Sequence, residues 1–400
     1  MTRIVIVGAG PAGLTLAKLL SLQGIDTMLF EQRSREYIEQ RTRAGILEQP
    51  TVDLMTEVGL GDRIAAEGIT HDGFYLTFDG VRHHLDFHSL VGGHATVYPQ
   101  QELVKDLVAD RISSGGHIEF EANVTAIDNR LDGATVTVER DGTAHEIEAD
   151  FVACCDGFHG VGRASIPAGA LDEITRTYPA AWLGILARTA PITDEGMYCP
   201  HPNGMSLHSM RGPRITRQYL QVPPDTDLDD WSDERIWDEL SIRCEGACAD
   251  GLERGEIFDR SLAPLRSYVN RTMHYRRVFL LGDSAHIVPP TGAKGLNLAV
   301  SDAVVLAHAL AAHVLGGEDR WLETYSDTAL PRVWQAELFS ARLTMTLHRF
   351  SDDPMEWHLN RATLQSWVDS EDQRRALGSV YFGLPFPIGW QYAGASPVSA

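Results

Sequence analysis

A glycine-rich segment near the N-terminus, Gly8-Ala9-Gly10-Pro11-Ala12-Gly13, has the spacing of a dinucleotide-binding turn. It follows an apolar run at residues 4–7 and opens residues 12–23, whose leucines recur at helical spacing. Gly8 permits the tight turn, Gly10 lets the backbone approach a pyrophosphate, and Gly13 lets the helix pack closely on the strand. Glu31 ends a second apolar run, where a carboxylate accepts hydrogen bonds from ribose hydroxyls. The pattern predicts a bound dinucleotide but does not distinguish FAD from NAD.

A second glycine-rich segment, late in the chain, makes that distinction. An apolar run at residues 277–281 leads into Gly282-Asp283 and then into Pro290-Thr291-Gly292-Ala293-Lys294-Gly295. An aspartate at the end of a strand binds a ribityl hydroxyl, and a glycine turn before a helix presents N–H groups and a positive dipole to an anionic, reduced flavin. A third glycine-containing stretch, residues 155–160, also follows an apolar strand. Together these stretches predict FAD.

The charge and composition of the chain exclude several classes of partner. The formal net charge is −21, from 34 basic and 55 acidic residues, which argues against nucleic acid and anionic membranes as partners. No window approaches the roughly 18 consecutive apolar residues of a membrane span, and the N-terminus does not have the pattern of a signal peptide. We therefore expect a cytoplasmic protein. The five cysteines lack the spacing of a zinc site, so we expect free thiols and no metal.

The elements that must position these motifs predict an α/β protein. We expect a Rossmann-type FAD-binding fold that is interrupted by a mixed β-sheet substrate domain and followed by a C-terminal helical segment. Alternating apolar residues around Asp79-Gly80 predict a hairpin within 72–87, and helices are expected over 319–350, with a break or kink at Pro331, and over 355–378. The expected parts are an FAD-binding domain (1–71, 96–175 and 265–318), a substrate-binding domain (72–95 and 176–264), a helical interface region (319–388) and a tail (389–400).

These motifs together resemble the single-component (class A) FAD-dependent aromatic hydroxylases, and among them the members that act on 4-hydroxybenzoate. The likeness extends to about residue 386, and its most specific stretches are 41–49, 155–160, 231–235, 263–267 and 282–297. The resemblance implies hydroxylation of 4-hydroxybenzoate to 3,4-dihydroxybenzoate with O₂ and NADPH or NADH, through a C4a-hydroperoxyflavin. It also implies a homodimer.

The resemblance assigns substrate-binding residues at both ends of the aromatic acid. Ser209, Met210, Arg211 and Tyr219 match the group that binds the substrate carboxylate, and an arginine fork suits that anion. At the phenol end the matching residues are Tyr198, Tyr381, His71, Pro290 and Thr291. The two tyrosines are expected to pass the phenol proton towards His71, the carbonyl of Pro290 to accept from the phenol, and Thr291 to border it.

The resemblance also assigns cofactor residues. The expected FAD-binding residues are Gly8, Gly10, Ala12, Gly13, Glu31, Arg41, Arg43, Ala44, Gly45, Ile46, Gln100, Asp283, Gly295, Leu296 and Asn297. Arg43, His159 and Arg266 match the residues that engage the nicotinamide cofactor. Arg217 matches the arginine that influences flavin movement between buried and exposed positions.

Two departures from the family pattern leave alternatives open. Gly196 stands where a bulkier apolar residue is expected, so 4-aminobenzoate and 3,4-dihydroxybenzoate are alternative substrates for the same mechanism. Glu31 is followed by Gln32 rather than by an arginine, although Arg33 or Arg35 would suit the 2′-phosphate of NADPH. A reaction of another class, that of a flavin reductase or sensor without oxygen transfer, predicts NADPH oxidation that ignores aromatic acids.

Overall fold

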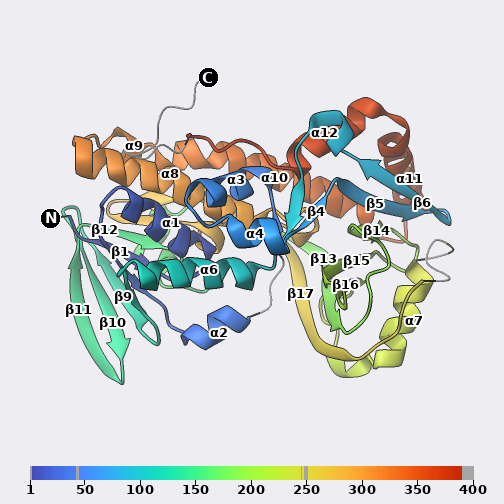
Figure 1. Cartoon of the computed structure of the whole chain (residues 1–400), viewed down its shortest axis with the longest axis horizontal. Coiled ribbons are helices and arrows are strands. Elements are labelled where there is room, and N and C mark those ends of the chain that lie inside the picture. Colours follow the sequence, from blue (N-terminus) through green and yellow to red (C-terminus); the bar gives the residue numbers. More distant parts are fainter. Residues whose placement is uncertain (1, 42–44, 245, 247–250, 390–400) are drawn as a thin grey trace.

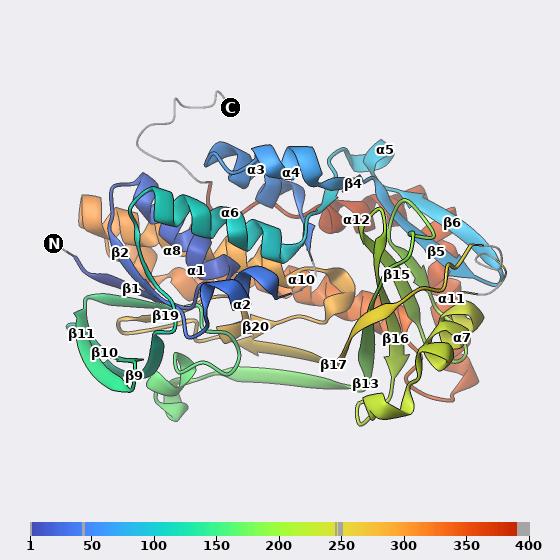
Figure 2. The same cartoon turned by 60° about the horizontal axis from the view of Figure 1, so that its bottom comes forward.

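Two large β-sheets lie towards opposite ends of the molecule, and long helices from the C-terminal half run between them (Figures 1 and 2). The computed structural model describes residues 2–41, 45–244, 246 and 251–389. One sheet has six strands and the other has eight, and helices pack around both. The mixed α/β class expected from the sequence is confirmed.

The six-stranded sheet is the core of the dinucleotide fold. Its order is β18-β19-β12-β1-β2-β8, and the five strands from β19 to β8 are parallel. Every residue of the central strand β1 is buried, as expected for a strand covered on both faces. The strands are β1 (Ile4–Val7), β2 (Thr27–Phe30), β8 (His117–Glu119), β12 (Phe151–Cys154), β18 (His274–Tyr275) and β19 (Val278–Leu280). Three helices cover this sheet: α1 (Pro11–Leu22), α6 (Gln100–Ser113) and α8 (Gly295–Gly316).

The eight-stranded sheet carries the other half of the site. Its order is β20-β17-β13-β16-β15-β14-β5-β6, and all its neighbouring strands are antiparallel except β14 and β5. Asp79 and Gly80 both have positive φ, as a two-residue hairpin turn requires, which confirms the hairpin. The strands are β5 (Gly73–Phe78), β6 (Val81–Asp86), β13 (Glu173–Ala187), β14 (Met197–Cys199), β15 (Ser206–Gly212), β16 (Ile215–Val222), β17 (Ile257–Asn270) and β20 (His286–Ile287).

Two small sheets and several short helices complete the fold. One three-stranded sheet is formed by β9 (Asn123–Asn129), β10 (Ala134–Arg140) and β11 (Thr143–Ala149), and another by β3 (Ile46–Leu47), β7 (Ala95–Val97) and β4 (Ile69–His71). The short helices are α2 (Arg35–Gln40), α3 (Gln49–Glu57), α4 (Asp62–Glu67), α5 (His88–Val91) and α7 (Asp233–Arg243). Two 3₁₀ turns, η4 (Gly282–Ser284) and η5 (Pro290–Gly292), precede α8.

The C-terminal helices differ from the expectation at two points. α10 (Tyr325–Leu347) continues through Pro331, so the predicted break is absent. The buried residues Arg332 and Val333 follow directly, and their tertiary contacts outweigh the hydrogen bond that proline removes. The expected helix over 355–378 is two helices, α11 (Pro354–Asp369) and α12 (Glu371–Tyr381), because the side chain of Ser370 caps a new start by accepting from Gln373 N–H. A short helix, α9 (Arg320–Glu323), precedes α10.

One helix in the described part of the chain, α8, is long and apolar enough to cross a membrane. In this structure 67% of its apolar window is buried inside the protein, against α1 and α10. Its composition is therefore that of a core helix.

A buried carboxylate links the segments that meet between the two sheets. Glu48 forms ion pairs with Lys294 Nζ (2.8 Å) and Arg332 Nη2 (2.7 Å), and all three side chains are at most 6% exposed. Lys294 also donates to the carbonyls of Val380 (2.6 Å) and Tyr381 (3.0 Å). Burial lowers the pKa of both Lys294 and Arg332, and the charge of Glu48 opposes that change. The start of α8, the middle of α10 and the end of α12 are thus tied to one residue.

We predict that Glu48→Gln lowers the free energy of unfolding by about 3–5 kcal/mol, because it leaves two buried cations without a counter-charge. Urea denaturation of the FAD-loaded protein measures this loss. The control is Glu39→Gln, which removes an exposed pair with Arg35 and should cost less than about 1 kcal/mol. Equal stability of the two variants would contradict the structural role of Glu48.

Candidate active site

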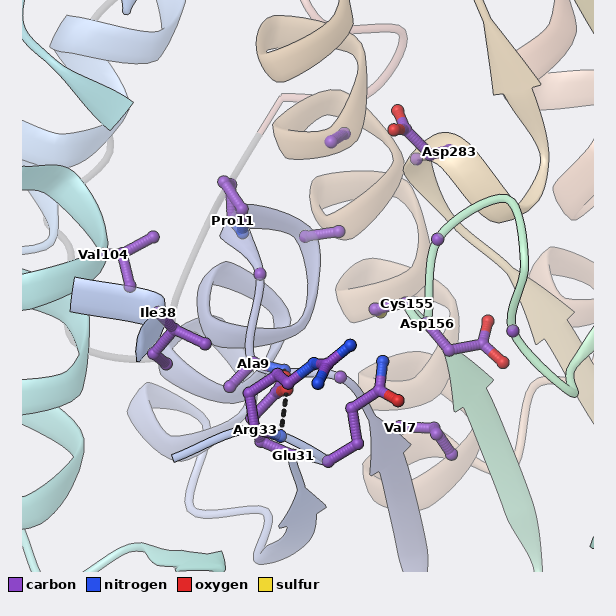
Figure 3. A pocket seen from close by; sticks show the side chains of 18 of the residues that line it. Val7, Ala9, Pro11, Glu31, Arg33, Ile38, Val104, Cys155, Asp156 and Asp283 are labelled. Atoms are coloured by element: carbon purple, nitrogen blue, oxygen red, sulfur yellow. Dashed lines mark hydrogen bonds between the residues drawn. The ribbon is translucent and has the colours of Figure 1, made fainter. Parts of the chain in front are cut away.

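A cavity of about 390 Å³ lies where the carboxyl ends of the parallel strands meet the starts of α1 and α8 (Figure 3). Its lining residues come from segments far apart in the sequence. The predicted cofactor residues among them are Gly8, Gly10, Ala12, Glu31, Arg41, Gln100, Asp283, Gly295 and Leu296. The fold thus brings together the two glycine-rich segments that the sequence pointed to separately.

The glycine turn at the start of α1 leaves no room for side chains on its inner side. Gly8 has a φ of +100°, and a Cβ on it would lie 2.4 Å from the carbonyl oxygen of Cys155. A Cβ on Gly13 would lie 2.1 Å from the carbonyl oxygen of Gly8. Around Gly10 and Gly295, in contrast, a Cβ would meet no atom within 4 Å, because both face open space. The backbone at the starts of two helices is therefore open to a ligand, as binding of a pyrophosphate and a flavin requires.

Two carboxylates lie well apart along this cavity (Figure 3). Glu31 is buried, and its two oxygens accept from the backbone N–H groups of Ala9 and Arg33, both at 2.8 Å. These bonds hold the side chain at the cavity and leave further lone pairs for ribose hydroxyls. Asp283 is exposed in the 3₁₀ turn η4 and also lines the cavity. The spacing of two helix starts and two carboxylates fits FAD.

Four other described residues that were predicted to bind FAD lie outside the lining of the cavity: Gly13, Gly45, Ile46 and Asn297. Asn297 is fully buried. Its side-chain oxygen accepts hydrogen bonds from Glu48 N–H and Thr51 Oγ1. Its side-chain nitrogen donates to the carbonyls of Ile46 and Ala293. Gly45 allows close packing on the segment before α6, since a Cβ there would lie 2.3 Å from the carbonyl oxygen of Tyr98. These contacts position the start of α8 and of α6. Arg43 and Ala44 lie outside the described residues.

Two of the predicted nicotinamide residues, His159 and Arg266, lie against the ring of Phe158, to which the sequence analysis gave no role. Phe158 has the guanidinium of Arg266 at 3.9 Å and that of Arg163 at 4.2 Å from its ring centroid, and it packs edge-on against His159. His159 is exposed at the rim of the FAD cavity. A cluster of two arginines and a histidine is suited to an anionic cofactor. The available signal was Phe158 next to His159, with Arg163 five residues after the phenylalanine.

The hairpin of β15 and β16 carries the predicted carboxylate-binding residues. Ser209 pairs with Arg217 across the hairpin and donates its hydroxyl to the Arg217 carbonyl (2.8 Å). Burial lowers the pKa of Arg211, and Tyr219 is hydrogen-bonded to its guanidinium. The Nε of Arg211 is buried without a partner within the described part of the chain. A half-buried guanidinium with an unpaired Nε–H is suited to an anionic ligand.

Arg217, the predicted flavin-movement residue, lies beside this hairpin cluster. Its guanidinium donates to Ser261 Oγ (3.1 Å) and lies 3.5 Å from Asp259 Oδ2 and 5.3 Å from the centroid of the Tyr219 ring. A Cβ on Gly184 would lie 2.9 Å from its Nη2. Arg217 therefore contacts the same tyrosine that bonds Arg211.

Two buried tyrosines that are far apart in the sequence, Tyr198 and Tyr381, pack against one phenylalanine, Phe74. The ring of Phe74 lies 5.1 Å from Tyr198 and 5.4 Å from Tyr381, edge-on to both. Tyr198 donates its hydroxyl to the carbonyl of Thr291 (2.8 Å), and burial raises the pKa of both tyrosines. The Pro290 carbonyl accepts from Ala293 N–H (3.0 Å) in the 3₁₀ turn η5 and keeps a second lone pair. The sequence reading missed Phe74, because alternation shows only that it faces inwards.

His71 lies buried at the end of β4. Neither of its ring nitrogens has a hydrogen-bond partner within the described residues. Desolvation lowers its pKa to about 4, and the charge of Arg211 adds to this effect, while Asp194 and Asp72 oppose it. His71 is therefore a neutral imidazole near pH 7, and its pKa depends in part on the charge of Arg211.

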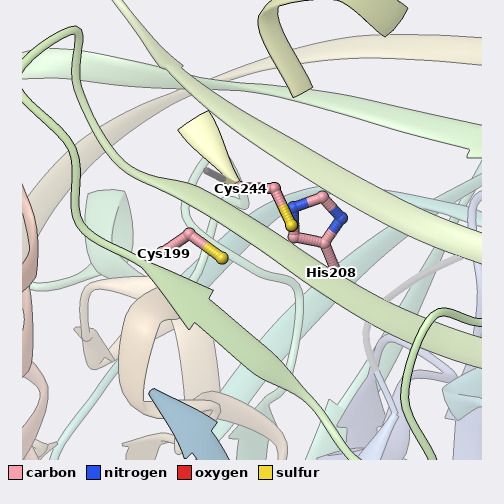
Figure 4. A group of neighbouring side chains, drawn as sticks. All are labelled: Cys199, His208 and Cys244. Carbon is pink, nitrogen blue, oxygen red and sulfur yellow. The ribbon is translucent and has the colours of Figure 1, made fainter. Parts of the chain in front are cut away.

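Three metal-ligating side chains, Cys199, His208 and Cys244, also converge behind β14 (Figure 4). Their ligand atoms lie within 4.8 Å of one another, and all three residues are buried. Cys244 is disulfide-bonded, which corrects the expectation that every cysteine is a free thiol. Whether two sulfur atoms reach bonding distance depends on backbone geometry that sequence spacing does not give. Because the sulfur of Cys244 is used, two ligands remain, and both are buried away from the water that would have to complete the coordination of a zinc ion.

Sequence comparison identifies relatives along the whole chain. Residues 1–340 match the family described as FAD binding domain. The p-hydroxybenzoate hydroxylase of Acinetobacter baylyi is 40% identical over 97% of this chain and 96% of its own length. A rifampicin monooxygenase of Rhodococcus hoagii is 28% identical over 83% of this chain and 68% of its own length.

Solved structures share the fold. The p-nitrophenol 4-monooxygenase of Pseudomonas putida superposes with a TM-score of 0.81 at 18% identity, covering 94% of this chain and 97% of its own. The anhydrotetracycline hydroxylase of Streptomyces rimosus has a TM-score of 0.78 at 24% identity, covering 99% of this chain and 78% of its own. With the FAD cavity described above, these matches establish that the chain belongs to the FAD-binding-domain family of flavin-dependent aromatic monooxygenases and is an enzyme of that kind.

Proposed function

We propose that this enzyme hydroxylates 4-hydroxybenzoate at the 3-position. In the balanced reaction, 4-hydroxybenzoate, NAD(P)H, a proton and O₂ give 3,4-dihydroxybenzoate, NAD(P)⁺ and water. The observation that carries the proposal is the guanidinium of Arg211, whose buried Nε lacks a partner within the described residues, on the same hairpin as Ser209 and Tyr219. The relative that is 40% identical over 97% of the chain, a p-hydroxybenzoate hydroxylase, supports it.

The hairpin of β15 and β16 is the proposed site for the substrate carboxylate. Arg211 provides charge and planar donors, and the hydroxyls of Ser209 and Tyr219 lie on the same hairpin. In a protein of net charge −21, such a local cation offsets the long-range repulsion of an anionic substrate. Met210, between these residues, is buried and supports the hairpin from the other face.

Tyr198 is the proposed partner of the para hydroxyl. Because its own proton is donated to Thr291 O, its oxygen has lone pairs for the substrate phenol. Its raised pKa keeps it a neutral phenol, able to accept one proton and release another towards Tyr381. Withdrawing the proton enriches the substrate ring in electrons, which favours electrophilic oxygen transfer. FAD, when bound, supplies the redox chemistry, accepting two electrons from the nicotinamide cofactor and passing them to O₂.

We further propose that substrate binding prepares His71 to receive the proton. The positive charge of Arg211 is one cause of the lowered pKa of His71. A substrate carboxylate on Arg211 neutralises that charge and therefore raises the proton affinity of His71. The pKa of His71 is thus higher when a substrate carboxylate occupies the site.

The cofactor roles and domain limits are part of the same proposal. Glu31, Asp283 and the two glycine turns hold FAD, while His159 and Arg266 receive NADPH or NADH on the outer face, together with Arg43. Arg217, held through Ser261 and Asp259 on β17, influences flavin movement.

The FAD-binding domain comprises 1–71, 96–175 and 265–318, and the substrate domain comprises 72–95 and 176–264. We also propose a cytoplasmic homodimer, whose interface would cover exposed apolar residues of α10 and α11 such as Leu338 and Leu359.

Related para-substituted benzoates are the alternative substrates. A Cβ on Gly196 would meet no atom within 4 Å, so the segment before Tyr198 leaves open space. This observation favours 4-aminobenzoate or 3,4-dihydroxybenzoate as additional substrates for the same carboxylate site. A reductase without oxygen transfer is disfavoured, since the relatives and structural neighbours compared are named as monooxygenases or hydroxylases.

Turnover with three acids, each with NADPH and with NADH, tests the proposed substrate. We expect 4-hydroxybenzoate to give nearly one diol per nicotinamide oxidised, and the other two acids to release more peroxide. Product and peroxide are quantified in the same reactions. NAD(P)H oxidation that is indifferent to all three acids would mean a reductase, and tighter coupling with another acid would replace the proposed substrate.

We predict that Arg211→Ala raises the KM for 4-hydroxybenzoate at least 100-fold, since loss of a charge-assisted pair costs about 3 kcal/mol. Steady-state kinetics at saturating NADPH measures this change. Arg214→Ala is the matched control, because Arg214 lies in the turn of the same hairpin and pairs with Glu253 at the surface. An unchanged KM in the Arg211 variant would contradict the proposal that Arg211 binds the substrate carboxylate.

For Tyr198→Phe we predict continued NADPH oxidation in the presence of substrate, with peroxide as the main product. Without the Tyr198 oxygen the substrate phenol loses its proton acceptor, so oxygen transfer slows relative to peroxide loss. Tyr178→Phe is the control, as it removes another buried hydroxyl, one bonded to Ser267 (3.2 Å). Unchanged diol yield in the Tyr198 variant would remove this residue from the proton path.

A further inference from the structure

A second group of metal-ligating side chains lies at the surface, apart from the FAD cavity. Asp72 follows β4, His88 begins α5 and His94 precedes β7, and each offers a ligand atom within 4.8 Å of the others. The side chains of Asp72 and His94 are 49% and 37% exposed, and His88 is also exposed, so an ion has access from solvent. None of the three has a role in the proposed reaction.

The backbone brings these residues together through strand pairing and a tight turn. β4 and β7 are antiparallel with His71 opposite Ala95, so Asp72 and His94 form the next pair along the ladder. Gly92 and Gly93 follow α5 with φ of +70° and +76°, a conformation that reverses the chain and that glycine adopts readily. The imidazoles of His88 and His94 consequently stack, with 4.2 Å between their centroids and 13° between their planes.

The hydrogen bonds of both rings define which nitrogen is available. His88 Nδ1 lies 2.8 Å from the carbonyl oxygen of Gly93, which only accepts, so this nitrogen carries the proton. His94 Nδ1 lies 2.8 Å from Asp72 Oδ1, a carboxylate oxygen. With the proton on Nδ1, each ring keeps a lone pair on Nε2. Nδ1–H bonded to a carbonyl or a carboxylate is the arrangement that supports histidines bound to metal.

We propose that His88, His94 and Asp72 form a binding site for one divalent transition-metal ion of the zinc class. The two imidazoles bind through Nε2 after the exposed His88 ring turns out of the parallel stack, because the in-plane lone pairs of stacked rings do not converge on one ion. The Asp72 carboxylate orients His94 and supplies negative charge, and water completes the coordination. Imidazole is a preferred ligand of Zn²⁺, Ni²⁺ and Cu²⁺, whereas Mg²⁺ and Ca²⁺ prefer oxygen ligands. The net charge of −21 raises the local concentration of any cation.

Binding at this site stabilises the surroundings of Tyr381. The N–H of His94 donates to Gln49 Oε1 (3.0 Å), and the N–H of Gln49 donates to the Phe382 carbonyl (2.8 Å). An ion held by His88 and His94 therefore immobilises a loop that is hydrogen-bonded to the end of α12. Because the ion binds the folded state, it raises the melting temperature.

The test is titration of ZnCl₂ into tag-free, EDTA-treated and dialysed FAD-loaded enzyme, followed by calorimetry and by thermal unfolding. We expect one saturable site and a melting temperature several degrees higher with zinc. His88→Gln and His94→Gln should each weaken zinc binding at least 10-fold and abolish the thermal shift. His83→Gln, a nearby histidine outside the cluster, and Cys199→Ser, in the buried cluster behind β14, should leave both unchanged. Cu²⁺ on the wild-type protein should show two equatorial nitrogen ligands by electron paramagnetic resonance.

Three results would overturn the site: absence of saturable binding below millimolar zinc, unchanged binding in both histidine variants, or loss of binding in Cys199→Ser. Absorbance of bound FAD and turnover without added metal check that the histidine variants are folded. Asp72→Asn provides an independent variant, in which zinc binding should also weaken.

Discussion

The buried charge of Glu48 is the constraint on which both halves of the molecule depend. It lies directly before α3, yet its two partners belong to the loop before α8 and to the middle of α10. Lys294 also donates a hydrogen bond to the carbonyl of Tyr381, and the side chain of Asn297 accepts one from the backbone N–H of Glu48. The segment that faces the flavin and the helix that carries a site tyrosine are thereby held by one buried carboxylate. Within a low-dielectric interior, removing it leaves two unpaired cations.

The active site arises where this network meets the edge of the eight-stranded sheet. Tyr198 comes from β14, Thr291 from η5 and Tyr381 from α12, and Phe74 from β5 packs against both tyrosines. The Tyr198 hydroxyl reaches the Thr291 carbonyl because β14 lies beside the loop that precedes α8. Burial favours the neutral form of Tyr198, Tyr381 and His71, and the charge of Arg211 adds to this effect at His71.

Local patterns were sufficient for much of the fold. The β1–α1–β2 opening and the hairpin at Asp79-Gly80 were predictable, because periodicity and turn chemistry act within a few residues. The continuation of α10 through Pro331 and the division at Ser370 were not, because buried contacts of Arg332 and a cap decided them. The site residues were located by resemblance rather than by pattern. The contacts of Phe158 and Phe74 with site residues were not predicted, because the spacing of residues along the sequence does not show which side chains meet in the fold.

The sequence by itself determined the dinucleotide turn, the acidic partner Glu31 and the excess of negative charge, because each depends on residue type and short spacing. Tertiary structure decided which groups meet: Glu48 with Lys294 and Arg332, and His88 with His94 and Asp72. It also decided the pKa of His71, which follows from burial and from neighbours distant in the sequence. Desolvation and Coulomb interaction depend on distance in space, and only the folded chain defines that distance.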